Sequence, residues 1–135
     1  MKLVLDADVL IGALDGSDSH HVQARELFTD WQEQQATRLM SVVNLSEVLV
    51  APGSDPERLR SAREAIAALG VEVHRPGEAI GVHAARLRGQ YPISLPDAYC
   101  LATAGHTGGA VASFDRKVLR AAEEEDLSIA AMART

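Results

Sequence analysis

Short apolar runs alternate with helix-type patterns along the chain, and this alternation predicts the secondary structure. Apolar runs of a few residues, bounded by polar or turn residues, are typical of buried strands. They predict strands over residues 2–5, 38–43, 71–74 and 110–114, and a last edge strand over residues 127–131. Apolar positions three or four residues apart predict amphipathic helices. We expect those helices over residues 8–14, 19–35, 44–50, 55–69, 78–88, 97–104 and 116–125.

Capping and breaking residues support several of these boundaries. Asn44 is expected to cap the helix after the second strand, and Pro52-Gly53 to end it. Asp55 followed by proline is typical of a helix start, whereas residues 92–96 are expected to form a loop. Strands that alternate with helices predict a parallel sheet with helices on both faces. The predicted class is therefore α/β, with three α/β/α layers and a mainly parallel sheet of four to five strands.

Length and composition limit the architecture. The 135 residues fit one domain, so residues 1–135 are expected to fold as a unit, and the 47% hydrophobic content suffices for a core. The single cysteine, Cys100, excludes an internal disulfide. No apolar run has the roughly 18 residues of a membrane span, and the first 14 residues lack the pattern of a signal peptide. A soluble, cytoplasmic protein is expected.

The acidic balance restricts the partners. A formal net charge of −6 argues against broad, nonspecific binding to nucleic acid, which needs a basic surface. It does not exclude nucleic acid as a substrate, because an acidic site can draw its phosphate affinity from a bound cation. It also suits a basic protein partner.

Four acids occupy positions where such a sheet binds ligands, beyond the carboxyl ends of its strands. Asp6 and Asp115 follow the first and fourth strands, Glu47 lies one turn into a helix, and Asp97 begins another. Taken singly, Asp97 and Asp115 can be helix caps, whereas Asp6 and Glu47 lie in apolar surroundings where an unpaired carboxylate is costly. Together, four converging anions need a cation between them.

The ligand types indicate which cation. Carboxylate oxygens with few neighbouring cysteine or histidine residues suit one or two magnesium or manganese ions rather than zinc. The five histidines show no zinc-type spacing, and none lies in the acidic segments; they are His20, His21, His74, His83 and His106. A carboxylate-held metal pair is the usual chemical solution for in-line attack of water on a phosphodiester.

Four segments around these acids resemble the PIN domain, and in particular the VapC ribonuclease toxins of bacterial toxin–antitoxin pairs. They are Leu3-Val4-Leu5-Asp6-Ala7-Asp8-Val9-Leu10-Ile11, Leu45-Ser46-Glu47-Val48, Leu95-Pro96-Asp97-Ala98-Tyr99-Cys100-Leu101-Ala102-Thr103-Ala104 and Ala112-Ser113-Phe114-Asp115. Each segment alone is a weak signal, but the four occur in the family's order and with its spacing over nearly the whole chain. The resemblance implies a PIN-like fold, RNA hydrolysis to a 5′-phosphate and a 3′-hydroxyl, homodimers, and inhibition by a cognate VapB-like antitoxin.

Residue roles follow from the same resemblance. Asp6, Glu47, Asp97 and Asp115 match the acidic quartet that binds divalent ions and activates water. Ser113 matches a small hydroxyl residue expected to support the site by hydrogen bonding.

Three neighbouring residues are less determined. Asp8 departs from the family pattern, where Ser, Thr or Asn is usual. It can be an additional metal ligand, an acceptor behind the metal ligands or a helix cap, and the last two roles are favoured because it precedes an apolar helix start. Arg116 and Lys117 lie next to Asp115, where they either contact RNA phosphates or form a solvated helix face. Arg86 and Arg88 have the same two interpretations.

Two alternatives remain open on the sequence. Asp6-Ala7-Asp8-Val9 also matches the opening motif of haloacid-dehalogenase-like phosphatases, with Asp6 as nucleophile, but that reading lacks a suitable later lysine and leaves Glu47 unexplained. A non-catalytic, partner-binding relative is the other alternative, although it should have lost at least one of the four acids. An inhibitor is expected to lay a helix in an apolar groove and to offer a basic residue to the acids, with residues 14–28 and 59–69 as groove walls.

Overall fold

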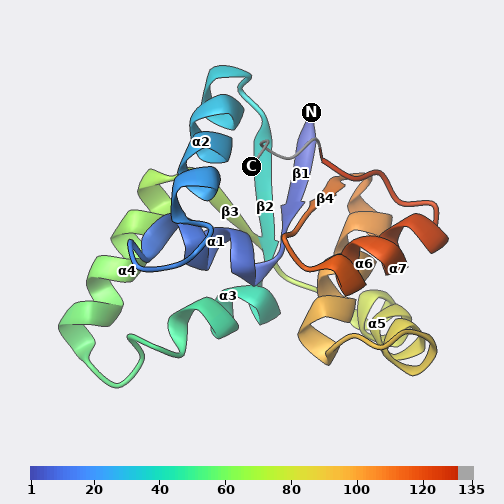
Figure 1. Cartoon of the computed structure of the whole chain (residues 1–135). Helices are drawn as coiled ribbons and strands as arrows, with labels where there is room; N and C mark the ends of the chain where they lie inside the picture. The colour runs from blue at the N-terminus through green and yellow to red at the C-terminus, as the bar shows by residue number, and fades with distance from the viewer. Residues whose placement is uncertain (131–135) are drawn as a thin grey trace.

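Four parallel strands form the centre of the computed structural model, which describes residues 1–130 (Figure 1). The strands are β1 (Lys2–Leu5), β2 (Thr37–Ser41), β3 (Val71–His74) and β4 (Ala110–Ala112), in the order β3-β2-β1-β4. Every neighbouring pair is parallel, so all four strands end at the same edge of the sheet. The predicted α/β class with a parallel sheet is confirmed.

Helices cover both faces of the sheet. One layer consists of α1 (Ala7–Leu14), α2 (His21–Glu33) and α4 (Pro56–Ala68), and the other of α5 (Glu78–Gln90), α6 (Leu95–Thr107) and α7 (Arg116–Glu124). The short helix α3 (Val42–Leu49) packs against α1 and α6 below the strand ends in Figure 1. The carboxyl edge of the sheet is therefore enclosed by elements from both layers.

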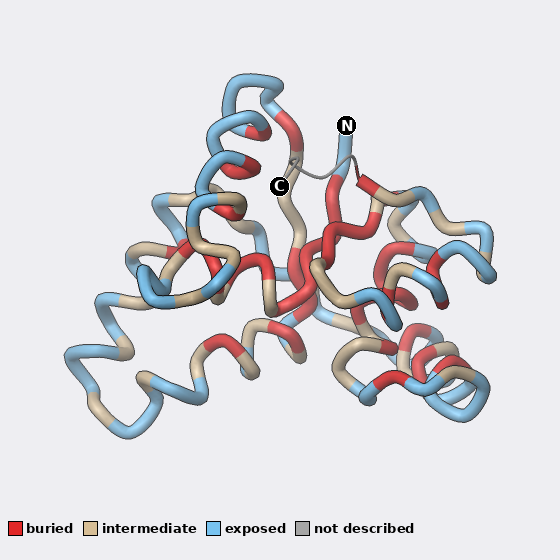
Figure 2. The backbone as a smooth tube through the Cα atoms, viewed as in Figure 1, coloured by how far each residue is buried: buried red, intermediate tan, exposed pale blue. Residues whose placement is uncertain are grey.

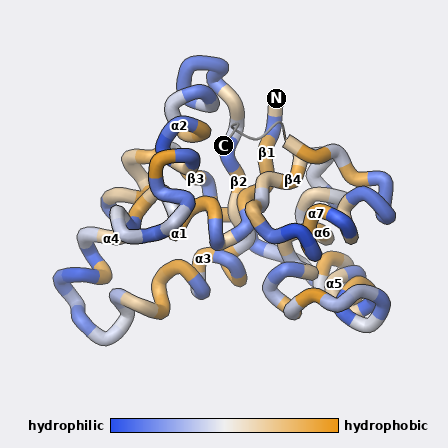
Figure 3. Tube along the Cα trace, viewed as in Figure 1, coloured by the Kyte–Doolittle hydropathy of each residue, from blue (hydrophilic) through white to orange (hydrophobic). Residues whose placement is uncertain are grey.

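The sheet separates two apolar cores because side chains alternate between its faces. In β1, Leu3 and Leu5 belong to the core beneath α1, α2 and α4, whereas Val4 belongs to the core beneath α5, α6 and α7. Figure 2 shows the buried residues concentrated along the strands and the inner sides of the helices, and Figure 3 shows that apolar residues occupy much of the same backbone. Within the described residues, no helix is long and apolar enough to cross a membrane.

The second strand ends two residues earlier than predicted. Ser41 ends β2 and caps α3, since its Oγ accepts a hydrogen bond from the Val43 amide at 3.3 Å. Val42 and Val43 are therefore helical, and the prediction that Asn44 caps this helix is wrong. A serine at a strand end satisfies a free amide of the next helix, which an apolar-run argument does not detect.

Several further boundaries differ from the prediction. Strand β4 ends at Ala112 rather than at residue 114, and helices α5 and α6 extend to Gln90 and Thr107 rather than to residues 88 and 104. Helix α6 begins at Leu95 rather than at residue 97, because Ser94 caps it and Pro96 lies in the first turn, where its missing amide costs no hydrogen bond. Helix α2 begins at His21 rather than at residue 19. In the predicted last strand, Ile129 forms a single parallel bridge with Val111, and residue 131 lies outside the described residues.

Candidate active site

Five carboxylates from both halves of the chain gather at the carboxyl edge of the sheet. They are the predicted Asp6, Glu47, Asp97 and Asp115, together with Asp8, and we call them the acidic cluster. Their charges act on one another: Asp8 and Asp97 raise the pKa of Asp6, Asp97 and Asp115 raise that of Asp8, and Asp97 raises that of Glu47. The fold thus brings together the four acids that the sequence singles out, with the fifth acid, Asp8, beside them.

Asp6 lies at the centre of this arrangement. It follows β1 directly, is 3% exposed and is the N-cap of α1. Its Oδ1 accepts a hydrogen bond from the Ala7 amide at 2.9 Å, and its Oδ2 accepts one from Ser113 Oγ at 2.7 Å. Both carboxylate oxygens are therefore oriented by the protein.

Ser113 connects three acids. Besides donating to Asp6, its Oγ lies 3.5 Å from Asp8 Oδ2 and accepts a hydrogen bond from the Asp115 amide at 3.0 Å. Asp8 is not the cap of α1, because Asp6 is; its Oδ2 accepts a hydrogen bond from the Phe114 amide at 3.0 Å. Asp8 therefore ties α1 to the segment after β4, while its buried Oδ1 has no hydrogen-bond partner.

Asp97 and Asp115 also serve as helix caps. Asp97 forms a capping box with Ser94 at the start of α6, and its Oδ2 accepts a hydrogen bond from the Ser94 amide at 3.2 Å. Asp115 is the N-cap of α7, and its Oδ1 accepts a hydrogen bond from the Lys117 amide at 2.8 Å. Each carboxylate uses one oxygen in its cap, so a capping role leaves the other oxygen for a ligand.

Asn44 is the residue of this site whose role the sequence argument missed. It is fully buried, and its Nδ2 donates to Glu47 Oε1 at 3.3 Å and to the Pro96 carbonyl at 3.0 Å. It thereby links α3 to the first turn of α6, which carries Asp97. The available signal was a polar residue three positions before a glutamate in an apolar helix, a spacing that places both on one face.

Burial and mutual repulsion make the cluster reluctant to ionise. Burial, followed by the charge of Asp8, raises the pKa of Asp6 from 3.8 to about 8. Burial is also the main cause that raises the pKa of Asp8 to about 6 and the pKa of Glu47 above its usual range. Within the described residues no lysine, arginine or histidine forms an ion pair with the cluster. Its negative charge is therefore not neutralised by the protein.

These residues fit a hard divalent cation. The donors of Asp6, Glu47, Asp97 and Asp115 are all carboxylate oxygens, which Mg²⁺ and Mn²⁺ prefer as ligands. Behind them, Oδ1 of Asp8 is buried without a hydrogen-bond partner among the described residues. Within residues 1–130, however, no three His, Cys, Asp or Glu side chains form a ready-made metal-binding group. A hydrated ion fits such a set better than a fully protein-ligated one, because Mg²⁺ tends to bind through one or two carboxylates and to retain several waters.

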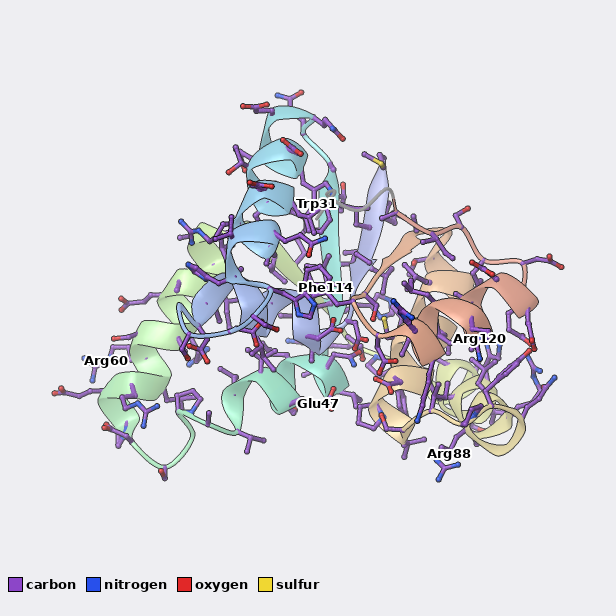
Figure 4. The ribbon with its side chains drawn as sticks, in the orientation of Figure 1. Trp31, Glu47, Arg60, Arg88, Phe114 and Arg120 are labelled. Carbon is purple, nitrogen blue, oxygen red and sulfur yellow. The ribbon has the colours of Figure 1, made fainter. Side chains whose placement is uncertain are left out.

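The basic residues near the cluster lie at its margin. Arg116 and Lys117 are exposed in the first turn of α7, directly after Asp115. Arg86 is engaged elsewhere, because its Nη2 lies 2.7 Å from Glu125 Oε1 in an ion pair on the side of α5 and α7. Arg88 lies in the last turn of α5, and in Figure 4 it points outward at the lower margin of the molecule rather than toward Glu47.

Comparison with known proteins identifies the family to which a chain with this three-layer fold and acidic edge belongs. The sequence matches the PIN domain family over residues 3–124, and the chain therefore belongs to the PIN domain family. No curated protein sequence matches the chain significantly.

Solved structures share the fold at low sequence identity. The Mycobacterium tuberculosis toxin VapC20, described as cleaving the sarcin–ricin loop, is 16% identical with a TM-score of 0.72, over 88% of this chain and 94% of that chain. VapBC2 from Rickettsia felis, bound to a promoter DNA fragment, is 14% identical with a TM-score of 0.75, over 96% and 98% of the two chains. A toxin–antitoxin complex from Klebsiella pneumoniae is 22% identical with a TM-score of 0.68, over 87% and 89%. These similarities establish a fold shared with VapC-type toxins.

Proposed function

We propose that the protein is a divalent-metal-dependent endoribonuclease and the toxin of a type II toxin–antitoxin pair. The observation that carries the proposal is the un-neutralised acidic cluster at the carboxyl edge of a PIN-domain sheet. Asp6, Glu47, Asp97 and Asp115 would hold one or two Mg²⁺ or Mn²⁺ ions. When bound, such ions lower the pKa of water and offset the charge that develops on the phosphate during hydrolysis.

The protein's own residues orient the ligands. Ser113 and the Ala7 amide hold both oxygens of Asp6, and Asn44 holds Glu47 against the first turn of α6. Hydrogen bonds of this kind fix ligand orientation, and their loss typically lowers metal affinity or activity 10- to 100-fold. Asp8 would act behind the ligands, as an acceptor for the Phe114 amide.

A cleavage assay with single-stranded RNA tests the catalytic proposal. The purified full chain should cut the RNA with Mg²⁺ or Mn²⁺, stop in EDTA, and leave 5′-phosphate and 3′-hydroxyl ends. Asp6→Asn and Asp97→Asn should abolish cutting. Asp55→Asn should not, because Asp55 caps α4 outside the cluster. Cutting that persists in both cluster variants would refute the mechanism, and a wild-type protein without nuclease activity would favour a non-catalytic relative.

The haloacid-dehalogenase-like alternative is disfavoured by membership in the PIN domain family. It makes an opposite prediction, because Asp8 would then be the general acid. Hydrolysis of a small phosphoester that is lost in Asp8→Asn, with no RNA cleavage, would restore that alternative.

An apolar groove supports the antitoxin partner. It lies between α1, α3 and α4, has a volume of about 740 Å³, and is lined by Ile11, Leu14, Val48 and Ala62 and by Glu47 of the cluster. An amphipathic helix in this groove would bring a basic side chain to the acids. The sequence predicted residues 14–28 and 59–69 as the walls of this groove. Helix α4 and Leu14 do line it, but α2 does not, so the first of these two ranges is corrected.

Co-expression with the protein encoded by the neighbouring reading frame tests this partnership. We expect the two proteins to co-purify and RNA cleavage to be suppressed, and Ala62→Glu to weaken both effects. Size-exclusion chromatography with light scattering tests the homodimer that the family resemblance implies. Charge reversal of Arg116 and Lys117 tests their role: unchanged cleavage rates would assign them to the solvated face of α7.

A further inference from the structure

An aromatic pair lies beside the acidic cluster and has no role in the chemistry proposed above. The rings of His20 and Phe114 stack with their centroids 4.2 Å apart and their planes 8° apart. We infer that this pair is a stacking platform for one base of a single-stranded RNA substrate. The inference rests on the proposed ribonuclease function, which it deepens by naming a substrate contact.

Phe114 ties the platform to the carboxylates. It lies between Ser113, which donates to Asp6, and Asp115 of the cluster. Its own amide donates to Asp8 Oδ2 at 3.0 Å. Figure 4 shows Phe114 near the centre of the molecule, between the two groups of helices and above Glu47. A base on this platform would belong to a nucleotide next to the acidic cluster.

His20 is held in place before any ligand binds. In the loop between α1 and α2, its amide donates to Asp18 Oδ2 at 2.9 Å. The following residue, His21, donates from its amide to the Asp18 carbonyl at 3.0 Å and from Nδ1 to the Gly12 carbonyl at 2.8 Å. These bonds hold the backbone of the loop. The ring itself is positioned by its stack on Phe114 and by its Nδ1, which lies 3.5 Å from Ser19 Oγ and 3.8 Å from Asp18 Oδ2. A ring positioned in this way requires little ordering on binding, which favours affinity.

The platform is open to a ligand. One face of the His20 ring lies on Phe114, yet the side chain is still 44% exposed. The other phenylalanine, Phe28, is buried and makes an edge contact with Trp31 in the core. Phe114 is therefore the phenylalanine whose ring contact lies at the acidic edge rather than in the interior.

Charge explains why a base is the expected occupant. The cluster and the net charge of −6 repel a phosphate backbone, so cations alone would have to supply the attraction. Stacking adds affinity that does not depend on charge, and unpaired RNA presents free base faces to aromatic and histidine side chains.

Cleavage kinetics of His20 variants test the platform. On a single-stranded heteropolymeric RNA with Mn²⁺, His20→Ala should raise KM about 5- to 100-fold, the range expected for one lost stack, with a much smaller change in kcat. His20→Phe should have a KM close to that of the wild type, because it keeps the aromatic face on which a base would stack and lacks only the ring nitrogens. The salt dependence of KM should stay the same in all variants, since no phosphate contact is lost. His106→Ala is the matched control. His106 is an exposed histidine that also has a ring contact, to His83, but it lies in the last turn of α6, whereas Asp97 of the acidic cluster lies in the first.

RNAs with single abasic positions locate the stacked base. At one position, removal of the base should raise the wild-type KM and make His20→Ala no worse than wild type. Melting temperatures of the variants, measured in parallel, report any structural role.

The outcomes separate the inference from the proposed function. Wild-type protein that neither cleaves nor binds RNA would defeat the ribonuclease proposal and the platform with it. Active wild type with an unchanged KM in His20→Ala would overturn the platform alone. An increase in KM that His20→Phe shares with His20→Ala would also overturn the platform. The same holds for an increase in KM that accompanies a lower melting temperature and is equal on intact and abasic RNA. Weaker inhibition by the antitoxin with an unchanged RNA KM would assign the pair to a protein partner and overturn the inference.

Discussion

Replacement of Asp6 by asparagine should stabilise the metal-free protein, although the same change should abolish cleavage. Asp6 is 3% exposed, and burial and its acidic neighbours raise its pKa from 3.8 to about 8. A group that ionises near 3.8 in the unfolded chain but near 8 in the folded chain favours unfolding at neutral pH. Asparagine has nearly the same shape and carries no charge to bury.

The magnitude follows from proton linkage. In the unfolded chain, pH 7 lies about 3 units above the pKa of the Asp6 carboxyl, whereas in the folded chain pH 7 lies below that pKa. The difference corresponds to about 4 kcal/mol of lost stability in the wild type. Asparagine keeps one acceptor oxygen but loses one of the two hydrogen bonds, from Ala7 or Ser113, at a cost of about 1–2 kcal/mol. The expected net gain is about 2–3 kcal/mol, or about 5–15 °C in melting temperature for a domain of this size.

Thermal unfolding in EDTA between pH 4 and pH 8 measures the effect. Because the pKa of Asp6 is raised in the folded chain, its contribution to the stability of the wild type is fully present below the unfolded pKa near 4. This contribution is lost as the pH rises through about 8. The advantage of Asp6→Asn should therefore be absent near pH 4 and grow toward pH 8. Saturating Mg²⁺ should reduce this advantage, because ion binding stabilises the folded wild type.

Asp55→Asn is the matched control. Asp55 is also the N-cap of a helix, but it lies outside the cluster, and aspartate and asparagine cap about equally well. Its stability should stay within about 0.5 kcal/mol of wild type at every pH. If Asp6→Asn melts at or below the wild-type temperature at pH 7, or if its gain does not depend on pH, the electrostatic account of the cluster is wrong.

Three further substitutions test the packing and hydrogen bonding behind the site. Ser113→Ala should lower RNA cleavage about 10- to 100-fold while the circular dichroism spectrum stays native, because it removes the hydroxyl that orients Asp6; an unchanged rate would contradict this role. Asn44→Ala should destabilise the protein by about 1–3 kcal/mol in urea unfolding, since it removes a fully buried link between α3 and α6; no change in the midpoint would refute it. Gly109→Ala should cost about 1–3 kcal/mol, because its Cβ would lie 2.7 Å from Cγ2 of buried Val4. Gly89→Ala, with open space around its Cβ on helix α5, should instead be neutral or stabilising, and equal effects of the two changes would contradict the packing argument.

Local patterns were sufficient for most of the fold. The apolar run at residues 2–5 and the helical spacing of Leu59, Ala62 and Ile66 predict their elements because burial of one face demands that periodicity. The patterns failed where a single polar side chain sets a boundary. Ser41 and Ser94 each start a helix earlier than predicted, since a hydroxyl that satisfies a free amide leaves no trace in hydrophobic spacing.

The acidic site also has features that the sequence predicts and features that only the packing of the elements decides. The sequence alone predicted that Asp6 and Asp115 meet, because both follow parallel strands whose carboxyl ends share one edge. Only the tertiary structure decided how they are held: Ser113 donates to Asp6, Asn44 joins Glu47 to the start of α6, and His20 stacks on Phe114. The hydrogen bond from Ser113 to Asp6 spans 107 positions of the chain. Local periodicity records which face of an element is buried, but the partner of a polar or aromatic side chain depends on how distant elements pack.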